Sequence, residues 1–136
     1  MPLITRLQAD LEQVTAPFVK RLGLRVLDAD TGQVRLLMPV TAELVHGGGV
    51  LCGQALMAAA DTAMVLAMSA ALGAFRPMTT VQLQTSFLRP VPAGAGEVHV
   101  TCRILRRGKS LAFGEVEMTT ADGKLAAHAT TTYALL

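Results

Sequence analysis

The chain has 136 residues, of which 51% are hydrophobic and 16% are charged, and its formal net charge at pH 7 is +2. This length is enough for one domain with a sizeable core, so we expect a single domain over residues 1–136. The small net charge, without a basic stripe and interleaved aromatic residues, argues against a nucleic-acid partner. Because a typical globular protein carries about one quarter charged residues, the apolar surplus predicts an interface between copies of the chain, and hence a homo-oligomer.

The cysteines and the N-terminal segment indicate the cellular compartment. Cys52 and Cys102 have neither metal-ligand spacing nor the pattern of a disulfide framework, so we expect no metal site. The segment MPLITRLQADLEQV carries charged residues where a signal peptide needs an apolar run. We therefore expect a cytoplasmic, reduced protein. The run 50–75 is nearly long enough to span a bilayer, but Asp61 and other polar residues interrupt it, so we expect no membrane partner.

The N-terminal third of the chain predicts a helix and two strands. Leucines and other apolar residues recur at three- and four-residue spacing from Leu3 to Lys20, which predicts an amphipathic helix over about residues 3–20. Two short strands follow, Leu24–Asp28 and Gln33–Val40, joined by a turn around Thr31.

The middle of the chain predicts one long apolar helix. Glycines at positions 47–49 predict a flexible loop before it. The alanine-rich helix then runs from about Cys52 to about Leu72, with Gly73 as its C-cap.

The remainder of the chain alternates apolar and polar residues in four segments separated by short turns. These predicted strands are Val81–Phe87, Glu97–Ile104, Leu111–Thr119 and Lys124–Leu135. Short turns make neighbouring strands antiparallel, and a helix that is apolar on nearly every face must be covered on nearly every side. One antiparallel sheet wrapped around the central helix meets both demands. We therefore predict an α+β hotdog fold with an additional N-terminal helix.

Asp61 is the one carboxylate in the apolar helix. Such an aspartate often does no more than accept hydrogen bonds from neighbouring hydroxyls or face solvent. Here, however, the same helix carries Gly53 in its first turn. A helix N-terminus presents unpaired N–H groups and partial positive charge, which suit a developing oxyanion, and glycine lets a ligand approach the backbone closely. The helix thus carries a candidate base or nucleophile and a candidate oxyanion donor.

These two groups are too far apart to act together within one chain. Eight residues separate Gly53 from Asp61, which corresponds to roughly 12 Å of helix rise. A reacting carbon must lie within about 3–3.5 Å of its attacker. Two antiparallel helices meeting at a two-fold interface would place Gly53 of one copy opposite Asp61 of the other. We therefore expect a dimer as the minimal active unit.

Three stretches of the sequence together resemble one family. They are Cys52-Gly53-Gln54 with Ala60-Asp61-Thr62-Ala63, then VQLQTSFLRPVPAG at 81–94, then ILRRGKSLAFGEVEM at 104–118. These stretches resemble the PaaI-type acyl-CoA thioesterases of the hotdog (4-hydroxybenzoyl-CoA thioesterase) superfamily, and the resemblance covers about residues 20–135. It implies hydrolysis of an acyl-CoA thioester without a metal or other cofactor, by a homodimer or homotetramer.

The resemblance also implies roles for particular residues. Asp61 stands at the catalytic carboxylate, which acts as a base toward water or as a nucleophile on the thioester carbon. Gly53 stands at the glycine whose backbone N–H polarises the thioester oxygen. Thr80 falls where the family often has a serine or threonine that orients the water or the carboxylate, although it is also an ordinary strand residue.

The chain departs from the family pattern at the start of the helix. The family's usual His-Gly-Gly is Cys52-Gly53-Gln54 here, and His46 occupies the place where relatives carry asparagine or glutamine. The backbone donor of Gly53 survives this change, while His46 becomes a candidate hydrogen-bond donor or a second acid or base. We expect Cys52 and Gln54 to contact the substrate. Cys52, at the helix N-terminus, could act as a nucleophile, but the plainer interpretation is that it packs in the protein.

Three cations surround a predicted hairpin turn: Arg106, Arg107 and Lys109. The plain interpretation is a solvated hairpin tip. The phosphate groups of coenzyme A need cations and backbone donors, and the resemblance places this turn near the nucleotide and pantetheine.

Two further functions remain open on the same fold. Hotdog hydratases and dehydratases pair a histidine with an acid on the central helix, as His46 and Asp61 would here, but their approach to the helix is usually rich in proline, whereas this chain has the glycines at 47–49. The second function is that of a non-catalytic acyl-CoA-binding domain. The presence of both Asp61 and Gly53 argues against it.

Overall fold

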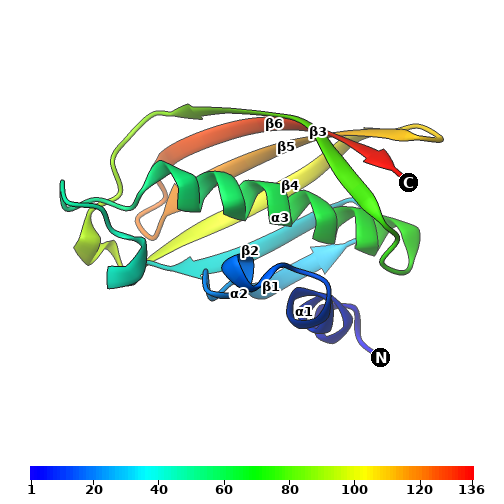
Figure 1. Ribbon diagram of the computed structural model, residues 1–136, viewed down its shortest axis with the longest axis horizontal. Coiled ribbons are helices and arrows are strands. Elements are labelled where there is room, and N and C mark those ends of the chain that lie inside the picture. Colours follow the sequence, from blue (N-terminus) through cyan, green and yellow to red (C-terminus); the bar gives the residue numbers. More distant parts are fainter.

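A twenty-residue helix, α3 (Gly53–Leu72), lies in the concave face of a six-stranded antiparallel sheet in the computed structural model, which describes residues 1–136 (Figure 1). The strand order across the sheet is β1-β2-β4-β5-β6-β3. The strands are β1 (Arg25–Asp30), β2 (Gln33–Pro39), β3 (Met78–Phe87), β4 (Glu97–Arg107), β5 (Leu111–Thr120) and β6 (Leu125–Leu135). This arrangement confirms the predicted α+β hotdog fold.

The sheet accounts for the apolar character of α3. The helix is long and apolar enough to cross a membrane by length and composition, but 67% of its most apolar stretch is buried in the protein core. Small side chains allow the close approach, and Gly114 on β5 shows how close it is. A Cβ at Gly114 would lie 2.5 Å from the Met64 sulfur, so a side chain at this strand position would require Met64 to move.

One stripe of α3 and one edge of the sheet remain uncovered. Met57, Ala58, Asp61 and Val65 are only half-buried, although their neighbours on the other faces of the helix are buried. Beside this stripe, β3 forms a ten-residue edge strand whose side chains are mostly exposed. A long open edge without proline or lysine is prone to pair with another chain.

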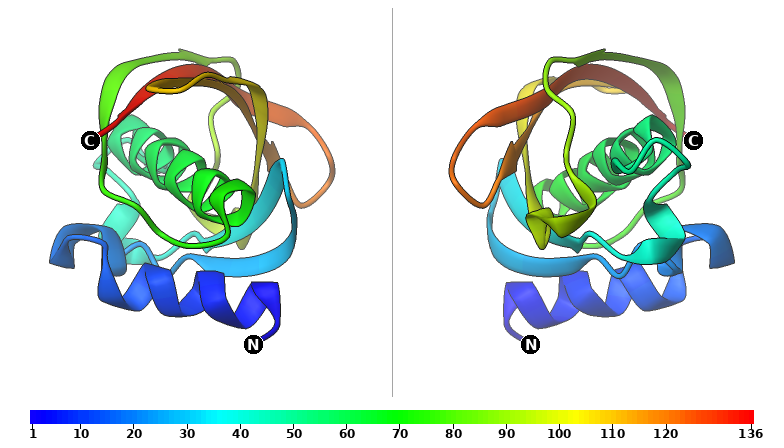
Figure 2. Two further views of the ribbon diagram at one scale, coloured as in Figure 1. Left: turned by 90° about the vertical axis from the view of Figure 1, so that its right-hand side faces the viewer. Right: turned by 90° about the vertical axis from the view of Figure 1, so that its left-hand side faces the viewer.

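The N-terminal segment forms two helices, so the prediction of one helix over residues 3–20 was wrong. α1 (Leu3–Gln13) packs along the β1 side of the molecule, and α2 (Pro17–Lys20) follows after a break (Figure 2). The physical reason is Pro17, because a proline disfavours helical geometry at the residue before it, and Ala16 is extended with ψ at 153°. α1 is fixed to α3 by Arg6, whose guanidinium donates to the Ser69 hydroxyl at 3.0 Å.

Most predicted boundaries lie close to the observed ones, with three instructive differences. β3 begins at Met78, three residues earlier than predicted, and β4 continues to Arg107. Gly73 caps α3 in the left-handed conformation, as predicted, with φ at +85°. The loop at 47–49, expected to be flexible, is a closed turn in which the Gly49 N–H donates to the His46 carbonyl at 2.9 Å. Two short 3-10 helices, η1 (Ala42–Leu44) and η2 (Ala93–Ala95), complete the connections.

Candidate active site

Asp61 lies half-buried on the uncovered stripe of α3, and two hydroxyl groups hold one of its carboxylate oxygens. The Thr80 hydroxyl donates to Asp61 Oδ1 at 2.8 Å, and the Tyr133 phenol lies 2.5 Å from the same oxygen. The phenol oxygen is also 3.0 Å from the main-chain carbonyl of Asp61. Asp61 Oδ2 has no hydrogen-bond partner in the chain. One carboxylate oxygen is therefore anchored, and the other is free to react.

The pairing of β3 with β6 explains why the two hydroxyls converge. Thr80 and Tyr133 lie directly opposite each other in this ladder, so their side chains leave the sheet on the same face, toward α3. The register shifts immediately after Thr80, which leaves Val81 as a bulge. The Thr131 hydroxyl donates to the Gln82 carbonyl at 2.9 Å and so ties β6 to β3 just beyond the bulge. Bulges of this kind re-aim side chains next to active sites.

Tyr133 acts on Asp61 as a neutral donor. Its side chain is only 3% exposed. Burial, reinforced by the hydrogen bond to the Asp61 carboxylate, raises the pKa of Tyr133 well above its ordinary value. The phenol therefore stays protonated and donates a hydrogen bond to the carboxylate.

The sequence analysis did not identify Tyr133 as a site residue. The signal was present, because Tyr133 is the one tyrosine in the chain and its strand otherwise carries mainly alanine and threonine. A hydroxyl at that position needs a partner when it is buried. What the sequence does not give is the strand register that sets Tyr133 opposite Thr80.

A cavity of about 200 Å³ opens beside Asp61. Its walls come from the connection between α1 and α2, from α2, from α3 and the connection that follows it, from the start of β3 and from the end of β6. The apolar lining residues include Val14, Val19, Val65 and Phe75. Asp61 is the one charged residue in the lining.

Gly53 lies at the N-terminal end of the helix, beside a different cavity. It is the first residue of α3, and its N–H has no hydrogen-bond partner in the chain. The ring of Phe87 packs so closely that a Cβ at Gly53 would lie 3.2 Å from it. The adjoining cavity measures about 240 Å³ and does not include Asp61. Within one chain, the predicted oxyanion donor and the predicted carboxylate thus occupy separate hollows.

His46 is directed toward its own turn. The ring is exposed, and its Nδ1 accepts a hydrogen bond from the Gly48 N–H at 2.8 Å. The structure therefore does not bring His46 and Asp61 together within one chain. The flanking residues Cys52 and Gln54 lie near Phe18 in a third, small hollow of about 130 Å³. No group of three or more histidine, cysteine, aspartate or glutamate side chains is arranged to hold a metal ion.

The three predicted cations lie at the far end of β4 and in the turn that follows it. Arg106, Arg107 and Lys109 are all exposed, and Arg107 donates to the Ala71 carbonyl at the end of α3, at 3.2 Å. They line neither the Asp61 cavity nor the Gly53 cavity. Any role for them in one site with Gly53 or Asp61 requires a second copy of the chain or a long ligand.

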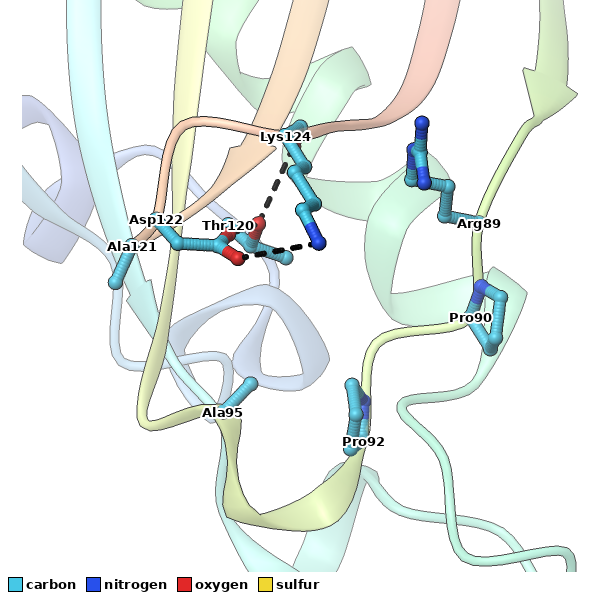
Figure 3. A pocket seen from close by; sticks show the side chains of 8 residues that line it. All are labelled: Arg89, Pro90, Pro92, Ala95, Thr120, Ala121, Asp122 and Lys124. Atoms are coloured by element: carbon cyan, nitrogen blue, oxygen red, sulfur yellow. Dashed lines mark hydrogen bonds and ion pairs between the residues drawn. The ribbon is translucent and has the colours of Figure 1, made fainter.

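The largest hollow, of about 510 Å³, lies between the β5–β6 turn and the connection from β3 to β4 (Figure 3). Lys124 pairs with Asp122 at 3.8 Å on one wall, and Arg89 stands on the other. Arg89 has no ion-pair partner and also lines the Gly53 cavity. Sequence reasoning did not single out Arg89, although it lies within the stretch that carries the family resemblance.

Comparison with known proteins gives consistent results. The family model for the thioesterase superfamily matches residues 45–127, which include Gly53, Asp61, Thr80 and the three cations. A Saccharolobus solfataricus protein named "Putative esterase SSO2140" is 32% identical over 110 residues, covering 81% of this chain and 76% of the relative. A Thermoplasma acidophilum protein with a similar name, "Putative esterase Ta0293", is 27% identical and covers 91% of this chain and 93% of its own length.

Solved structures extend the similarity to the fold. A variant of the phenylacetic acid degradation protein PaaI from Thermus thermophilus is 30% identical, with a TM-score of 0.78, covering 89% of this chain and 100% of that one. Escherichia coli PaaI, from the phenylacetic acid degradation operon, has a TM-score of 0.83 over 99% of this chain and 96% of its own. At 22% identity, this second likeness concerns the fold alone.

Proposed function

Since this chain belongs to the thioesterase superfamily and is a thioester or ester hydrolase, we propose that it hydrolyses an acyl-CoA thioester to the free acid and coenzyme A. The observation that carries the proposal is the Asp61 carboxylate, which lies on an apolar helix beside a cavity, with one oxygen held by two hydroxyls and the other without a hydrogen-bond partner. A group held in this way is ready for reaction, because its orientation is fixed before the substrate arrives.

In the proposed reaction, Asp61 Oδ2 acts as a base or as a nucleophile. As a base, it takes a proton from water, and the hydroxide attacks the thioester carbon. As a nucleophile, it attacks that carbon itself and forms an anhydride that water then hydrolyses. In both routes the C–S bond breaks, and the coenzyme A sulfur leaves as a thiolate that takes up a proton. Thr80 and Tyr133 keep Oδ1 engaged, so that Oδ2 is the oxygen presented to the substrate.

The negative charge on the thioester oxygen requires a donor, and we assign this role to the Gly53 N–H of a second copy. The N–H is unpartnered and lies at the positive end of a long helix. Two features of the chain support pairing of two copies. The half-buried stripe of α3 carries Asp61, and the open edge of β3 lies beside it. A homodimer formed on this face buries the stripe and is the minimal active unit that we propose; two such dimers would form a tetramer.

Coenzyme A carries phosphate groups that require cations. Arg106, Arg107 and Lys109 are exposed, with Arg107 held at the end of α3 by its hydrogen bond to the Ala71 carbonyl, and we assign the three to the nucleotide. Arg89 is a further candidate, because it lines the Gly53 cavity and has no carboxylate partner. We assign Cys52 and Gln54, which flank Gly53, to contacts with the pantetheine end of the substrate.

A hotdog hydratase would use His46 and Asp61 as one acid–base pair. The hydrogen bond from the Gly48 N–H to His46 Nδ1 directs the ring into its own turn and gives this alternative no support within one chain. In a non-catalytic acyl-CoA-binding domain, an unpartnered carboxylate oxygen beside the cavity would have no role. Its presence therefore favours a catalytic function.

A thiol-release assay over a panel of acyl-CoA thioesters separates the three functions. Free thiol formed in proportion to enzyme supports hydrolysis. Addition or loss of water at the acyl chain without free thiol points to a hydratase or dehydratase, and saturable binding without turnover points to a binding domain. Either of the last two outcomes overturns the proposed function.

A further inference from the structure

The cavity beside Asp61 carries information about the acyl group. Asp61, the group that we assign to the attack, lines this cavity, so the part of the substrate next to the reacting carbon must enter it or lie across its mouth. We propose that this cavity binds the acyl group, and that the enzyme acts on short, uncharged, apolar acyl groups of up to about eight carbons. This inference rests on the proposed thioesterase function and specifies its substrate class.

The first argument is the size of the cavity. Its volume is about 200 Å³. For comparison, a dry protein cavity of roughly 150 Å³ accepts a benzene molecule. The space beside Asp61 therefore holds about six to eight carbon atoms by the same measure. A longer acyl chain has to leave its tail in water or displace the α1–α2 connection, and every methylene left in water loses the gain from apolar burial.

The second argument is the lack of a positive charge. Among the ten residues that one chain contributes to the lining, none is a lysine, arginine or histidine, and the one charged group is the Asp61 carboxylate. An acyl group that ends in a carboxylate would enter this cavity without a cation and close to another negative charge. Burial of such a group is costly unless it is paired.

The third argument is that the hydroxyl protons in the lining are already used. The Thr62 hydroxyl donates to the Ala58 carbonyl at 2.8 Å, and the Thr15 hydroxyl donates to the Leu11 carbonyl at 2.5 Å. The Tyr133 phenol donates to Asp61. No hydroxyl proton is left for a polar acyl substituent, so the walls favour an apolar one.

The α1–α2 connection supplies the wall that sets chain length. Ala16 and Val19 line the cavity from this side, and Ala16 is exposed in an extended conformation before Pro17. A larger side chain at Ala16 fits the backbone and takes up part of the cavity. A smaller side chain at Val19 enlarges it.

The test measures kcat/KM by thiol release for acetyl-, hexanoyl-, octanoyl-, dodecanoyl- and glutaryl-CoA. For the wild-type protein, we expect the value for hexanoyl- or octanoyl-CoA to exceed those for dodecanoyl- and glutaryl-CoA at least tenfold. The Ala16→Leu variant should lower the octanoyl-to-acetyl ratio about tenfold, and Val19→Ala should raise the dodecanoyl-to-octanoyl ratio severalfold. Ala42→Leu, the same exchange at an exposed position in η1 that lines none of these cavities, should leave both ratios unchanged.

The outcomes distinguish this inference from the function on which it rests. If dodecanoyl- or glutaryl-CoA is the best substrate and Asp61→Asn abolishes its hydrolysis, the thioesterase function stands and the acyl-site inference is overturned. Ratios that do not change in Ala16→Leu and Val19→Ala overturn it as well. If no acyl-CoA on the panel releases thiol, the proposed function itself has failed.

Discussion

Two regions of α3, around Asp61 and around Gly53, differ in how complete they are. Around Asp61, near the middle of the helix, three side chains from three elements already form a hydrogen-bonded group beside a cavity. Around Gly53, at the first residue of the helix, one unpartnered N–H lies under the ring of Phe87, and the nearby His46 bonds to its own turn. One chain therefore holds a positioned attacking group at Asp61, whereas the oxyanion donor at Gly53 has no attacking group beside it. A second copy, placed antiparallel, would complete both.

Removal of the attacking group at Asp61 should have the largest effect. Asp61→Asn keeps the shape of the side chain and its contacts with the two hydroxyls but loses the basicity. We expect kcat for acyl-CoA hydrolysis to fall at least about 1,000-fold, because both the base and the nucleophile route use this carboxylate. Steady-state thiol release measures the loss, and an unchanged circular dichroism spectrum serves as the control. Near-normal turnover would remove Asp61 from the mechanism.

The Gly53 end is tested by deleting its N–H group. Gly53→Pro removes the donor and suits the first helical position, where proline is favoured, and the preceding Cys52 is already extended with ψ at 148°. We expect kcat to fall about 100- to 1,000-fold, as for other single oxyanion donors. Gly53→Ala is the matched control, since it keeps the N–H and requires the Phe87 ring to move by only a few tenths of an ångström. Equal losses in the two variants would indicate crowding rather than a lost donor.

The Asp61→Asn and Gly53→Pro variants also test whether Asp61 of one copy and Gly53 of the other form one site. Co-expression of Asp61→Asn and Gly53→Pro chains under different tags yields mixed dimers with one intact site out of two. These mixed dimers should recover up to about half of the wild-type activity, although neither variant is active alone. Mixed dimers as inactive as their parents would show that each chain builds its site by itself.

Loss of one anchor on Asp61 should have a smaller effect than loss of the carboxylate. Tyr133→Phe keeps the ring in the core and removes the phenol that donates to Oδ1. We expect kcat to fall about 10- to 100-fold, the range for one hydrogen bond to a charged group. Thr80→Val, which removes the other donor, should give a loss of similar size. A wild-type kcat in both variants would show that these hydroxyls do not contribute to catalysis.

The buried phenol also predicts how stability depends on alkaline pH. In the unfolded chain, tyrosine ionises near pH 10, but burial raises the pKa of Tyr133 well above this in the folded protein. The unfolded state therefore binds fewer protons above about pH 10, and stability falls as the pH rises. Urea unfolding from pH 8 to 11.5 should show a steeper fall for wild type than for Tyr133→Phe. Burial raises the pKa of Cys102 to about 12, which adds a fall of the same sign to both proteins.

The smallest effect is expected at His46. Its ring is exposed and accepts a hydrogen bond from the turn that it helps to form, so His46→Ala should lower kcat/KM only about fivefold or less. The assay is again thiol release. A loss as deep as that of Asp61→Asn would make His46 an obligatory group and would revive the acid–base pair of a hydratase-type site.

The sequence was sufficient to predict the fold and the bounds of the central helix. Alternation with period two located all four C-terminal strands, and the apolar run located α3 and its cap at Gly73. These patterns are local, because they follow from which residues must face a core. Local rules also explain the error in the N-terminal segment, since Pro17 is visible in the sequence and breaks the helix where the apolar spacing continues.

Tertiary structure decided which side chains meet Asp61. Thr80 and Tyr133 are 53 positions apart, and only the register of β3 against β6, with its bulge after Thr80, directs both hydroxyls at one oxygen. It also decided that His46 bonds to its own turn. Residue type and spacing determine which groups a chain possesses, whereas their directions depend on pairings between distant segments. A shift of one residue in such a pairing moves every side chain to the other face of the sheet.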